Sequence, residues 1–307
     1  MPELPEVETI ARGLAKRVTG DRVESVWLGQ KKEPLKSPAA EIAATLGQSR
    51  IAAVRRMGKH IVFDLDRNVD VGRTLMSAKG RKLKSSRPGS KTRLPQVSSM
   101  PQEEAHPTRA QWIVHLGMTG RLQVCEPLIE IDKHTHAILK LSSGRELRFV
   151  DPRRFGRLSV AKAADFDAGG VEPLEVDLER FLSLFHGRKT LIKSALLNQK
   201  LLRGVGNIYA DESLFRAGIR PRRRATTITR EDLGKLFVAV KEVLKEAIAL
   251  GGSSISDYVD ADGEEGFFQL QHRVYGREGE PCLVCKTPIK RVVIAGRSSH
   301  YCPKCQK

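Results

Sequence analysis

Two segments at opposite ends of the chain hold residues that could do chemistry, and the first is the N-terminus. The chain begins Met1-Pro2-Glu3, and loss of the initiator methionine would leave a secondary amine on Pro2 that can attack an electrophilic carbon and form an iminium. The pKa of an α-amino group lies about 2.5 units below that of lysine, so more of it is unprotonated near neutral pH. Glu3 could shuttle protons beside it. With Pro5 and Glu6, the same residues also make an ordinary helix start, and spacing alone leaves both interpretations open.

The second segment is a pair of Cys-x2-Cys motifs near the C-terminus, formed by Cys282, Cys285, Cys302 and Cys305. Their spacing is typical of a four-cysteine zinc site, and we favour one structural Zn2+ over disulfides because no signal peptide is evident. Six basic residues and no acidic residue lie between the motifs and in the tail, which suits contact with phosphates. The fifth cysteine, Cys125, is expected to be a buried free thiol.

The overall charge points to a polyanionic partner. The chain has 53 Lys and Arg against 36 Asp and Glu, which gives a net charge of +17 and a sequence pI of about 9.9. Its 307 residues, 40% of them hydrophobic, can bury a core and are enough for two domains. No apolar run long enough for membrane insertion is visible, so we expect no membrane association, and we expect a monomer.

The N-terminal half is predicted to be one helix followed by strands. Apolar residues at helical spacing mark one buried face: Val7, Ile10, Ala11, Leu14 and Val18. Strand-like runs lie at residues 22–28, 51–54, 60–65, 111–116, 137–141, 146–150 and 157–161. We therefore expect an α+β protein whose N-terminal catalytic domain, residues 2–165, is a β-sandwich or barrel-like domain with an N-terminal helix.

The C-terminal half is predicted to be helical. Helices are expected at residues 191–202, 208–217 and 230–250, the last with a capping-box pair at Thr229 and Asp232 and a glycine stop at Gly251 and Gly252. These helices make a second, helical domain over residues 170–270. The four-cysteine zinc finger, built on a β-hairpin, follows over residues 273–307.

Residues 67–110 interrupt the strand pattern. They hold ten basic and three acidic residues, four prolines, six serines and no aromatic residue. This composition predicts a disordered, solvated insertion between two neighbouring strands. It could add nonspecific attraction to DNA, or it could be a tolerated surface insertion, and the sequence leaves both open.

Five blocks, met in order along nearly the whole chain, resemble bacterial formamidopyrimidine-DNA glycosylase. The blocks are residues 1–9, 115–120, 151–156 and 204–210 and the four cysteines. The resemblance implies that the helical domain binds DNA through a helix-two-turn-helix. It also implies a bifunctional base-excision repair enzyme acting on damaged double-stranded DNA. Its expected substrates are 8-oxoguanine opposite cytosine and formamidopyrimidines, and its expected location is the bacterial cytoplasm, on the nucleoid.

The resemblance also implies roles at the reacting sugar. Pro2 attacks the anomeric carbon and expels the oxidised base, and the resulting imine drives β- and then δ-elimination of the flanking phosphates. Glu3 takes the acid/base role, and Glu6 a supporting role in the DNA-binding site. Lys59 lies near the phosphate and the lesion, whereas its residue type alone would suggest a solvated lysine at a strand edge.

Other residues are implied to contact DNA. Met118, Arg153 and Phe155 would fill the stack vacated by the everted base, with Arg153 facing the orphaned cytosine. Such a methionine and phenylalanine are more often core residues, and such an arginine a surface charge. Arg154 belongs to the same block.

The resemblance assigns three more contacts. His134 would touch DNA, although a surface histidine is equally consistent with its sequence context. Asn207 and Arg297 would clasp phosphates beside the lesion, with Arg297 counted among the catalytic residues, whereas Asn207 alone could be a plain helix N-cap. The glycine-containing stretch 251–276 resembles a loop that closes over an everted purine.

Two alternatives remain from the sequence. One is an endonuclease VIII-type glycosylase for oxidised pyrimidines, and Leu4 and the Arg153-Arg154-Phe155 block favour the purine enzyme over it. The other is a catalytically silent zinc-finger DNA-binding protein. The presence of both Pro2 and Glu3 argues against it, because binding alone requires neither.

Overall fold

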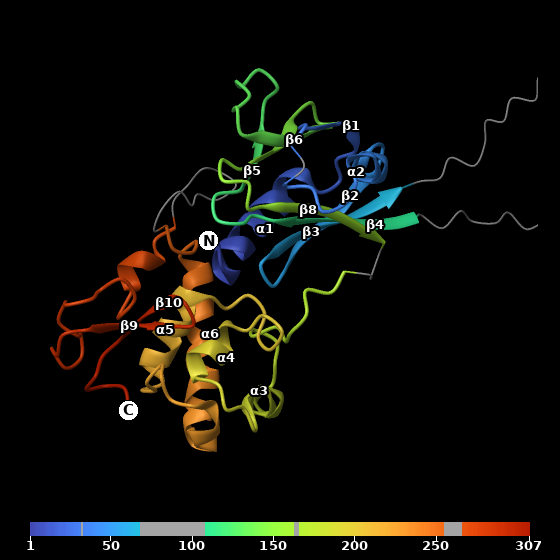
Figure 1. Cartoon of the computed structure of the whole chain (residues 1–307). Helices are drawn as coiled ribbons and strands as arrows, with labels where there is room; N and C mark the ends of the chain where they lie inside the picture. The colour runs from blue at the N-terminus through green and yellow to red at the C-terminus, as the bar shows by residue number, and fades with distance from the viewer. Residues whose placement is uncertain (32, 68–107, 163–165, 255–265) are drawn as a thin grey trace, which may run out of the picture.

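The computed structural model describes residues 1–31, 33–67, 108–162, 166–254 and 266–307. The chain forms two lobes, a sheet lobe and a helical lobe that ends in a hairpin, and the N-terminus lies where they meet (Figure 1). The predicted α+β architecture is confirmed. None of the helices in the described ranges is both long and apolar enough to cross a membrane.

The sheet lobe is a β-sandwich with one long helix. One antiparallel sheet has the order β1 (Val23–Leu28), β6 (Thr135–Leu141), β7 (Glu146–Val150) and β5 (Arg121–Cys125). The other has the order β2 (Arg50–Met57), β3 (His60–Arg67), β4 (Thr108–His115) and β8 (Arg157–Lys162). Residues of both sheets, of α1 (Leu4–Val18) and of α2 (Ala39–Leu46) share one apolar core.

Several predicted boundaries in this lobe are corrected by the structure. Arg67 ends β3 and pairs with Thr108 at the start of β4, so the ends of the segment 67–110 belong to strands. Residues 68–107, on which the predicted insertion falls, lie outside the described residues. Cys125 is a free thiol, but it is only half-buried, because it ends β5 at the edge of its sheet. Strand β5 and helix α2 were not predicted.

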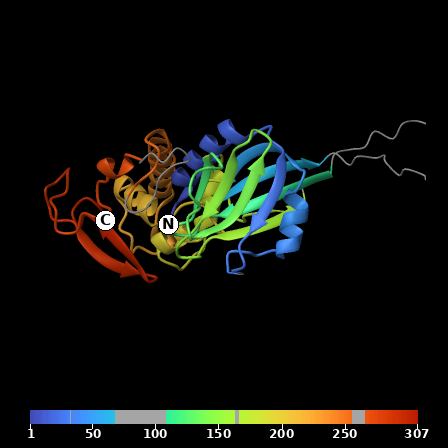
Figure 2. The same ribbon diagram turned by 90° about the horizontal axis from the view of Figure 1, so that it is seen from above.

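The helical lobe contains α3 (Leu178–Phe185), α4 (Ile192–Leu197), α5 (Asn207–Arg216), η1 (Ala225–Thr227), α6 (Arg230–Ala249) and η2 (Phe268–Gln271). The hairpin of β9 (Lys290–Ile294) and β10 (Arg297–Tyr301) lies on the side of this lobe away from the sandwich (Figure 2). The helix predicted over 191–202 ends at Leu197, because Asn198 adopts an extended backbone conformation and its side chain accepts the N–H of Lys200 at 3.0 Å. Only half of the predicted capping box forms: Thr229 accepts the N–H of Asp232, whose carboxylate faces Arg223 and Lys235 instead.

Helix α1 and one arginine join the two lobes. Leu4 is buried in the core of the helical lobe, whereas Val7, one turn later, is buried in the core of the sandwich. Arg56 on β2 donates to Glu8 on α1 at 2.7 Å and to both oxygens of Glu172 in the helical lobe at 2.8 and 3.0 Å. Only 7% of the Arg56 side chain and 6% of that of Glu172 is exposed.

This buried ion pair should contribute to the stability of the assembled lobes. We expect Glu172→Gln to lower the free energy of unfolding by roughly 1–3 kcal/mol, because it leaves a charge-assisted hydrogen bond of Arg56 unmade. Urea denaturation checks this. Glu231→Gln, which breaks the exposed pair with Lys235, is the control and should change stability by less than about 1 kcal/mol. Equal effects of the two variants would contradict this role for Arg56 and Glu172.

Candidate active site

A cavity of about 480 Å³ opens at the junction of the lobes, next to the N-terminus. Five of its lining residues are predicted site residues: Glu3, Lys59, Met118, Asn207 and Arg297. They come from the start of α1, the β2–β3 turn, the loop after β4, the start of α5 and the start of β10. Met1 lines the same cavity. Segments far apart in the sequence therefore meet around the N-terminus.

Glu3 is a buried carboxyl group with one oxygen unused. It is the N-cap residue of α1, and its backbone N–H donates to Glu6 Oε2 at 2.7 Å. Its Oε1 accepts the N–H of Ile208 at 3.2 Å, whereas nothing in the described parts of the chain hydrogen-bonds to its Oε2. Burial raises the pKa of Glu3, and the nearby Lys59 charge opposes this shift. A carboxyl of this kind can hold or release a proton within the cavity.

Glu6 lies beneath the cavity. It is 2% exposed, and its Oε1 accepts hydrogen bonds from the Tyr209 hydroxyl and from the N–H of Ser253. Burial raises the pKa of Glu6, and the charge of Glu3 adds to this effect. Its placement fits support of Glu3 and not direct contact with DNA.

Lys59 is buried, so the alternative of a solvated strand-edge lysine is wrong. It follows Gly58, whose positive φ of 60° makes the tight β2–β3 turn. Only 8% of Lys59 is exposed. Burial lowers the pKa of Lys59, whereas Glu3 raises it and Arg297 lowers it further. Besides the N-terminus, the cavity thus holds the amine of Lys59, whose pKa is depressed.

The turn at residues 204–206 fits closely against the N-terminus. The N–H of Leu4 donates to the carbonyl of Gly204 at 3.0 Å. A Cβ on Gly206 would lie 2.2 Å from the Glu3 carboxyl carbon, so this position requires glycine. Gln199 holds the turn by accepting from the N–H of Gly204 at 2.9 Å and donating to the carbonyl of Val205 at 2.8 Å.

Asn207 is the first residue of α5, and Gly206 is its N-cap. The alternative that Asn207 caps the helix is therefore wrong. Within the described residues its Oδ1 has no hydrogen-bond partner although it is buried. The first turn of α5 thus offers a polar side chain and the positive end of a helix dipole to the cavity.

Met118 and Phe155 are exposed, at 43% and 54%, so the alternative that they are core residues is wrong. The guanidinium of Arg153 lies 5.1 Å from the centre of the Phe155 ring. Buried Asp151 joins the two loops, because it accepts from the Thr119 hydroxyl at 2.6 Å and from the N–H of Gly156 at 2.8 Å. An apolar pair and a cation are thus presented together on linked loops.

Arg154 and His134 lie near these loops but not in the cavity. Arg154 has a positive φ of 58° and its side chain pairs with Glu33 at 3.2 Å. His134 is half-buried, and its carbonyl accepts from the N–H of Asp151 at 3.0 Å. The backbone of His134 is thus tied to Asp151, the residue that links the two loops.

The four cysteines of the two motifs can hold one zinc ion. Their sulfur atoms all lie within 4.8 Å of one another, with Cys282 to Cys305 at 3.9 Å and Cys285 to Cys302 at 3.4 Å. Tetrahedral Zn–S bonds of about 2.3 Å require sulfur–sulfur distances of about 3.8 Å, so the site fits Zn2+. The predicted structural zinc site is confirmed, and the ion would fix the base of the hairpin that carries Arg297.

Models of known families match the chain in three consecutive parts. The formamidopyrimidine-DNA glycosylase N-terminal domain matches residues 1–158, the H2TH domain of the same enzyme matches residues 170–259, and a zinc finger found in FPG and IleRS matches residues 279–307. A formamidopyrimidine-DNA glycosylase of Solibacter usitatus is 43% identical over the full length of both chains. The chain belongs to the formamidopyrimidine-DNA glycosylase family. It is therefore a base-excision repair DNA glycosylase with a structural zinc finger.

Solved structures of other family members share the whole fold. The MutM (Fpg) protein of Thermus thermophilus is 37% identical, with a TM-score of 0.77 over 99% of this chain and 98% of that one. A Lactococcus lactis Fpg variant in complex with DNA containing Fapy-dG is 28% identical, with a TM-score of 0.80 over the full length of both chains. A further Lactococcus lactis complex, at 27% identity and a TM-score of 0.79, contains an oxidised pyrimidine.

The site of this glycosylase also contains residues that were not predicted. Gln199 and Tyr275 line the cavity, and Tyr209 binds Glu6. His115 lines it as well; burial lowers its pKa to about 4, helped by His60, so its ring is neutral at physiological pH. Tyr209 and His115 lie within blocks that carry the family resemblance, which could have marked them. Tyr275 lies within the stretch 251–276, which resembles a loop of the family, but that resemblance did not single it out. Gln199 carries no such signal.

The close fit at Gly206 yields a direct test. We expect Gly206→Ala to displace the Glu3 carboxyl or the turn and to lower the excision rate at least roughly 10-fold, because a misplaced catalytic group loses its alignment. Single-turnover excision from a lesion-containing duplex measures this. Gly234→Ala on α6 is the matched control, since its Cβ meets nothing within 4 Å and the change should keep activity. A Gly206→Ala enzyme as fast as this control would contradict the placement of Glu3.

Proposed function

We propose that this glycosylase is bifunctional, with DNA glycosylase and AP lyase activities, and that it removes oxidised purines through an imine on Pro2. One observation carries the proposal. Met1 lines the cavity beside the buried carboxyl of Glu3, so removal of Met1 leaves the Pro2 amine at that place. A secondary amine next to a carboxyl with an unused oxygen is the pairing that nucleophilic displacement at a sugar requires.

The reaction proceeds through a covalent intermediate. The Pro2 nitrogen forms a bond to the anomeric carbon as the bond from that carbon to the oxidised base breaks, and the base leaves with a proton. Glu3, whose pKa burial raises, exchanges protons with the sugar as the ring opens to an iminium. The iminium then acidifies the adjacent sugar carbon, and β- and δ-elimination release the two flanking phosphates.

The surroundings of the cavity suit a damaged duplex. Arg297, Lys59 and Asn207 at the start of α5 all line the cavity, where they can hold the phosphates next to the lesion. Exposed Met118 and Phe155, with Arg153 against the ring, form a wedge that offsets the cost of swinging the base out of the stack. The Lactococcus lactis relative in complex with Fapy-dG DNA supports this substrate class.

The alternatives are weaker on this evidence. The relatives named here are formamidopyrimidine-DNA glycosylases, which favours oxidised purines, and the relative bound to an oxidised pyrimidine makes that lesion the natural comparison substrate. A silent DNA-binding protein has no need of a buried carboxyl in the cavity that its own N-terminus lines. We propose domains at residues 2–165, 170–270 and 273–307, and action as a monomer in the bacterial cytoplasm, on the nucleoid.

The role of Pro2 can be tested by substitution. We expect Pro2→Gly to bind a duplex with 8-oxoguanine opposite cytosine as the parent does but to lose base excision by at least roughly 100-fold. Gel-based excision and binding assays on the same duplex measure the two effects. The control Pro5→Ala removes the proline in the first turn of α1 and should keep activity. Unchanged cleavage by Pro2→Gly would rule out Pro2 as the nucleophile.

The pKa of Glu3 makes a prediction about stability. Because burial raises its pKa in the folded state, the contribution of Glu3 to stability is present at acid pH and is lost as the pH rises through the folded pKa. The free energy of unfolding of Glu3→Gln, relative to that of the parent, should therefore increase from pH 5 to pH 8. Urea unfolding at both values measures the gain.

Glu8 supplies a control of opposite sign. Although burial alone would raise its pKa, hydrogen bonds from Arg56 and Arg12 hold the pKa of Glu8 below its ordinary value. Glu8→Gln should therefore lose stability relative to the parent, most at neutral pH and least at acid pH. A Glu3→Gln difference that does not change with pH would refute the buried, proton-exchanging carboxyl.

A further inference from the structure

Helix α5 carries two adjacent acidic residues that the proposed reaction does not use. Asp211 and Glu212 are both fully buried, and neither lines the cavity. Buried carboxylates are costly unless they are paired and hydrogen-bonded. Each of them has partners from segments remote in the sequence, and these partners lead back to the cavity.

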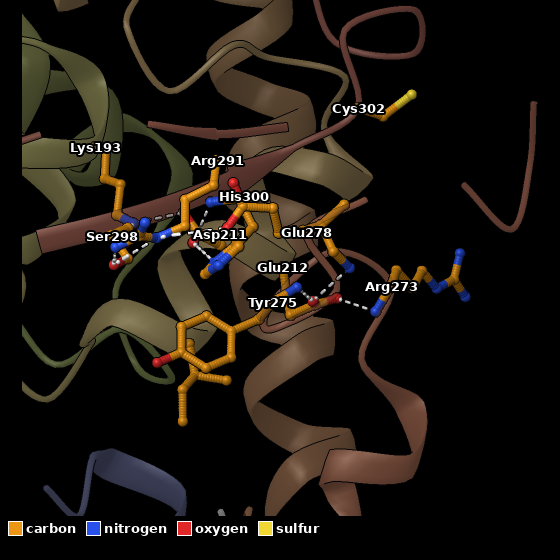
Figure 3. A network of polar contacts seen from close by, with 12 residues as sticks. Lys193, Asp211, Glu212, Arg273, Tyr275, Glu278, Arg291, Ser298, His300 and Cys302 are labelled. Atoms are coloured by element: carbon orange, nitrogen blue, oxygen red, sulfur yellow. Dashed lines mark hydrogen bonds and ion pairs between the residues drawn. The ribbon is translucent and has the colours of Figure 1, made fainter. Parts of the chain in front are cut away.

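Asp211 forms an ion pair with Lys193 on α4 (Figure 3). The two charged atoms lie 2.6 Å apart, and both side chains are completely buried. Each partner also binds the backbone of β10. Lys193 Nζ donates to the carbonyl of Ser298 at 2.8 Å, and the N–H of His300 donates to Asp211 Oδ2 at 2.9 Å. The pair thus holds β10 at two backbone positions.

These two positions fix the residue next to them. Ser298 immediately follows Arg297, the first residue of β10, which comes directly after a turn in which Ala295 and Gly296 have positive φ values of 47° and 73°. Arg297 is exposed and lines the cavity. Ser298 and His300 are hydrogen-bonded to the helical lobe. The backbone of Arg297 is therefore held in place beside the cavity.

The same helix positions other parts of the cavity. Asn207, which lines the cavity, lies four residues before Asp211 and therefore on the same face of α5. Glu212 accepts the N–H groups of Arg273, Val274 and Tyr275 at 2.8–2.9 Å, and Tyr275 lines the cavity (Figure 3). One rigid helix thus sets the distance between Asn207 and the finger.

A buried ion pair is a poor source of stability, since well-packed apolar residues of the same size often serve as well. Its directional bonds to two backbone groups do something that apolar packing cannot, namely fix the register of β10 on α4 and α5. We propose that Lys193 and Asp211 are positioning residues that hold Arg297 where it binds a phosphate in the cavity. This inference rests on the proposed function, in which Arg297 binds a phosphate of the damaged duplex.

The test is a double-mutant cycle read through the salt dependence of binding. The variants are Arg297→Ala, Asp211→Asn and the two combined, each bound to a duplex with a tetrahydrofuran abasic-site analogue over a range of salt concentrations. Losing one phosphate contact should lower the slope of log affinity against log salt by about one. We expect this loss for both single variants and no further loss for the double variant, because Asp211 acts through Arg297.

Controls separate positioning from general damage to the fold. Zinc content should stay at one ion per chain in every variant. Glu246→Gln, which breaks the ion pair between Glu246 on α6 and Arg216 on α5, should leave the slope unchanged. If Asp211→Asn does not fold, Lys193→Met combined with Asp211→Asn removes both charges together and should show the same loss.

The outcomes separate the positioning role of Asp211 from the phosphate-binding role of Arg297. If Arg297→Ala lowers the slope and Asp211→Asn either leaves it unchanged or adds a separate loss in the double variant, the positioning role is wrong and the phosphate role of Arg297 stands. Loss of zinc by Asp211→Asn would also overturn the positioning role. If Arg297→Ala leaves the slope unchanged, Arg297 binds no phosphate, and both the inference and that part of the proposed function fail.

Discussion

The site depends on the docking of the first residues of the chain against the turn at 204–206. The N–H of Leu4 bonds to Gly204, and the Glu3 carboxyl occupies the space where Gly206 lacks a side chain. Leu4 is buried in the helical lobe, whereas the helix it begins is buried in the sandwich. A residue at the free end of a chain is normally poorly ordered. Here it is fixed only when both lobes are assembled.

This docking brings several ionisable groups together at the lobe junction, where they are shielded from water. Glu3, Glu6 and Lys59 are all buried within the junction. Burial raises the pKa of the two carboxyls and lowers that of the lysine, so it favours the neutral form of each group. Such groups cost stability, which is typical of catalytic sites. The Arg56 and Glu172 pair and the insertion of Leu4 into the second core hold the lobes together around them. The contacts that hold the two lobes together therefore also hold the catalytic groups in place.

Much of the fold followed from local pattern. The buried face of α1, the strands with clear apolar runs in the described part of the chain, and the cysteine spacing were all predicted, because each is encoded within a few neighbouring residues. Strand β5 was missed because its burial does not alternate cleanly. Tyr275, Gln199 and Asp211 were missed for another reason: their roles arise from contacts with residues distant in the sequence. Family resemblance supplied what local pattern could not for Met118 and Phe155, whose exposure no periodicity reveals.

The central claim is that the amine placed by this docking is the nucleophile. The most direct test is borohydride trapping of the purified protein on a duplex with one 8-oxoguanine opposite cytosine, followed by mass analysis of the adducted peptide. The account predicts an adduct on an N-terminal peptide that begins at Pro2, with Met1 removed. An adduct on Lys59, whose amine also lines the cavity and has a depressed pKa, would contradict it. So would the absence of any adduct from a protein that binds the duplex tightly.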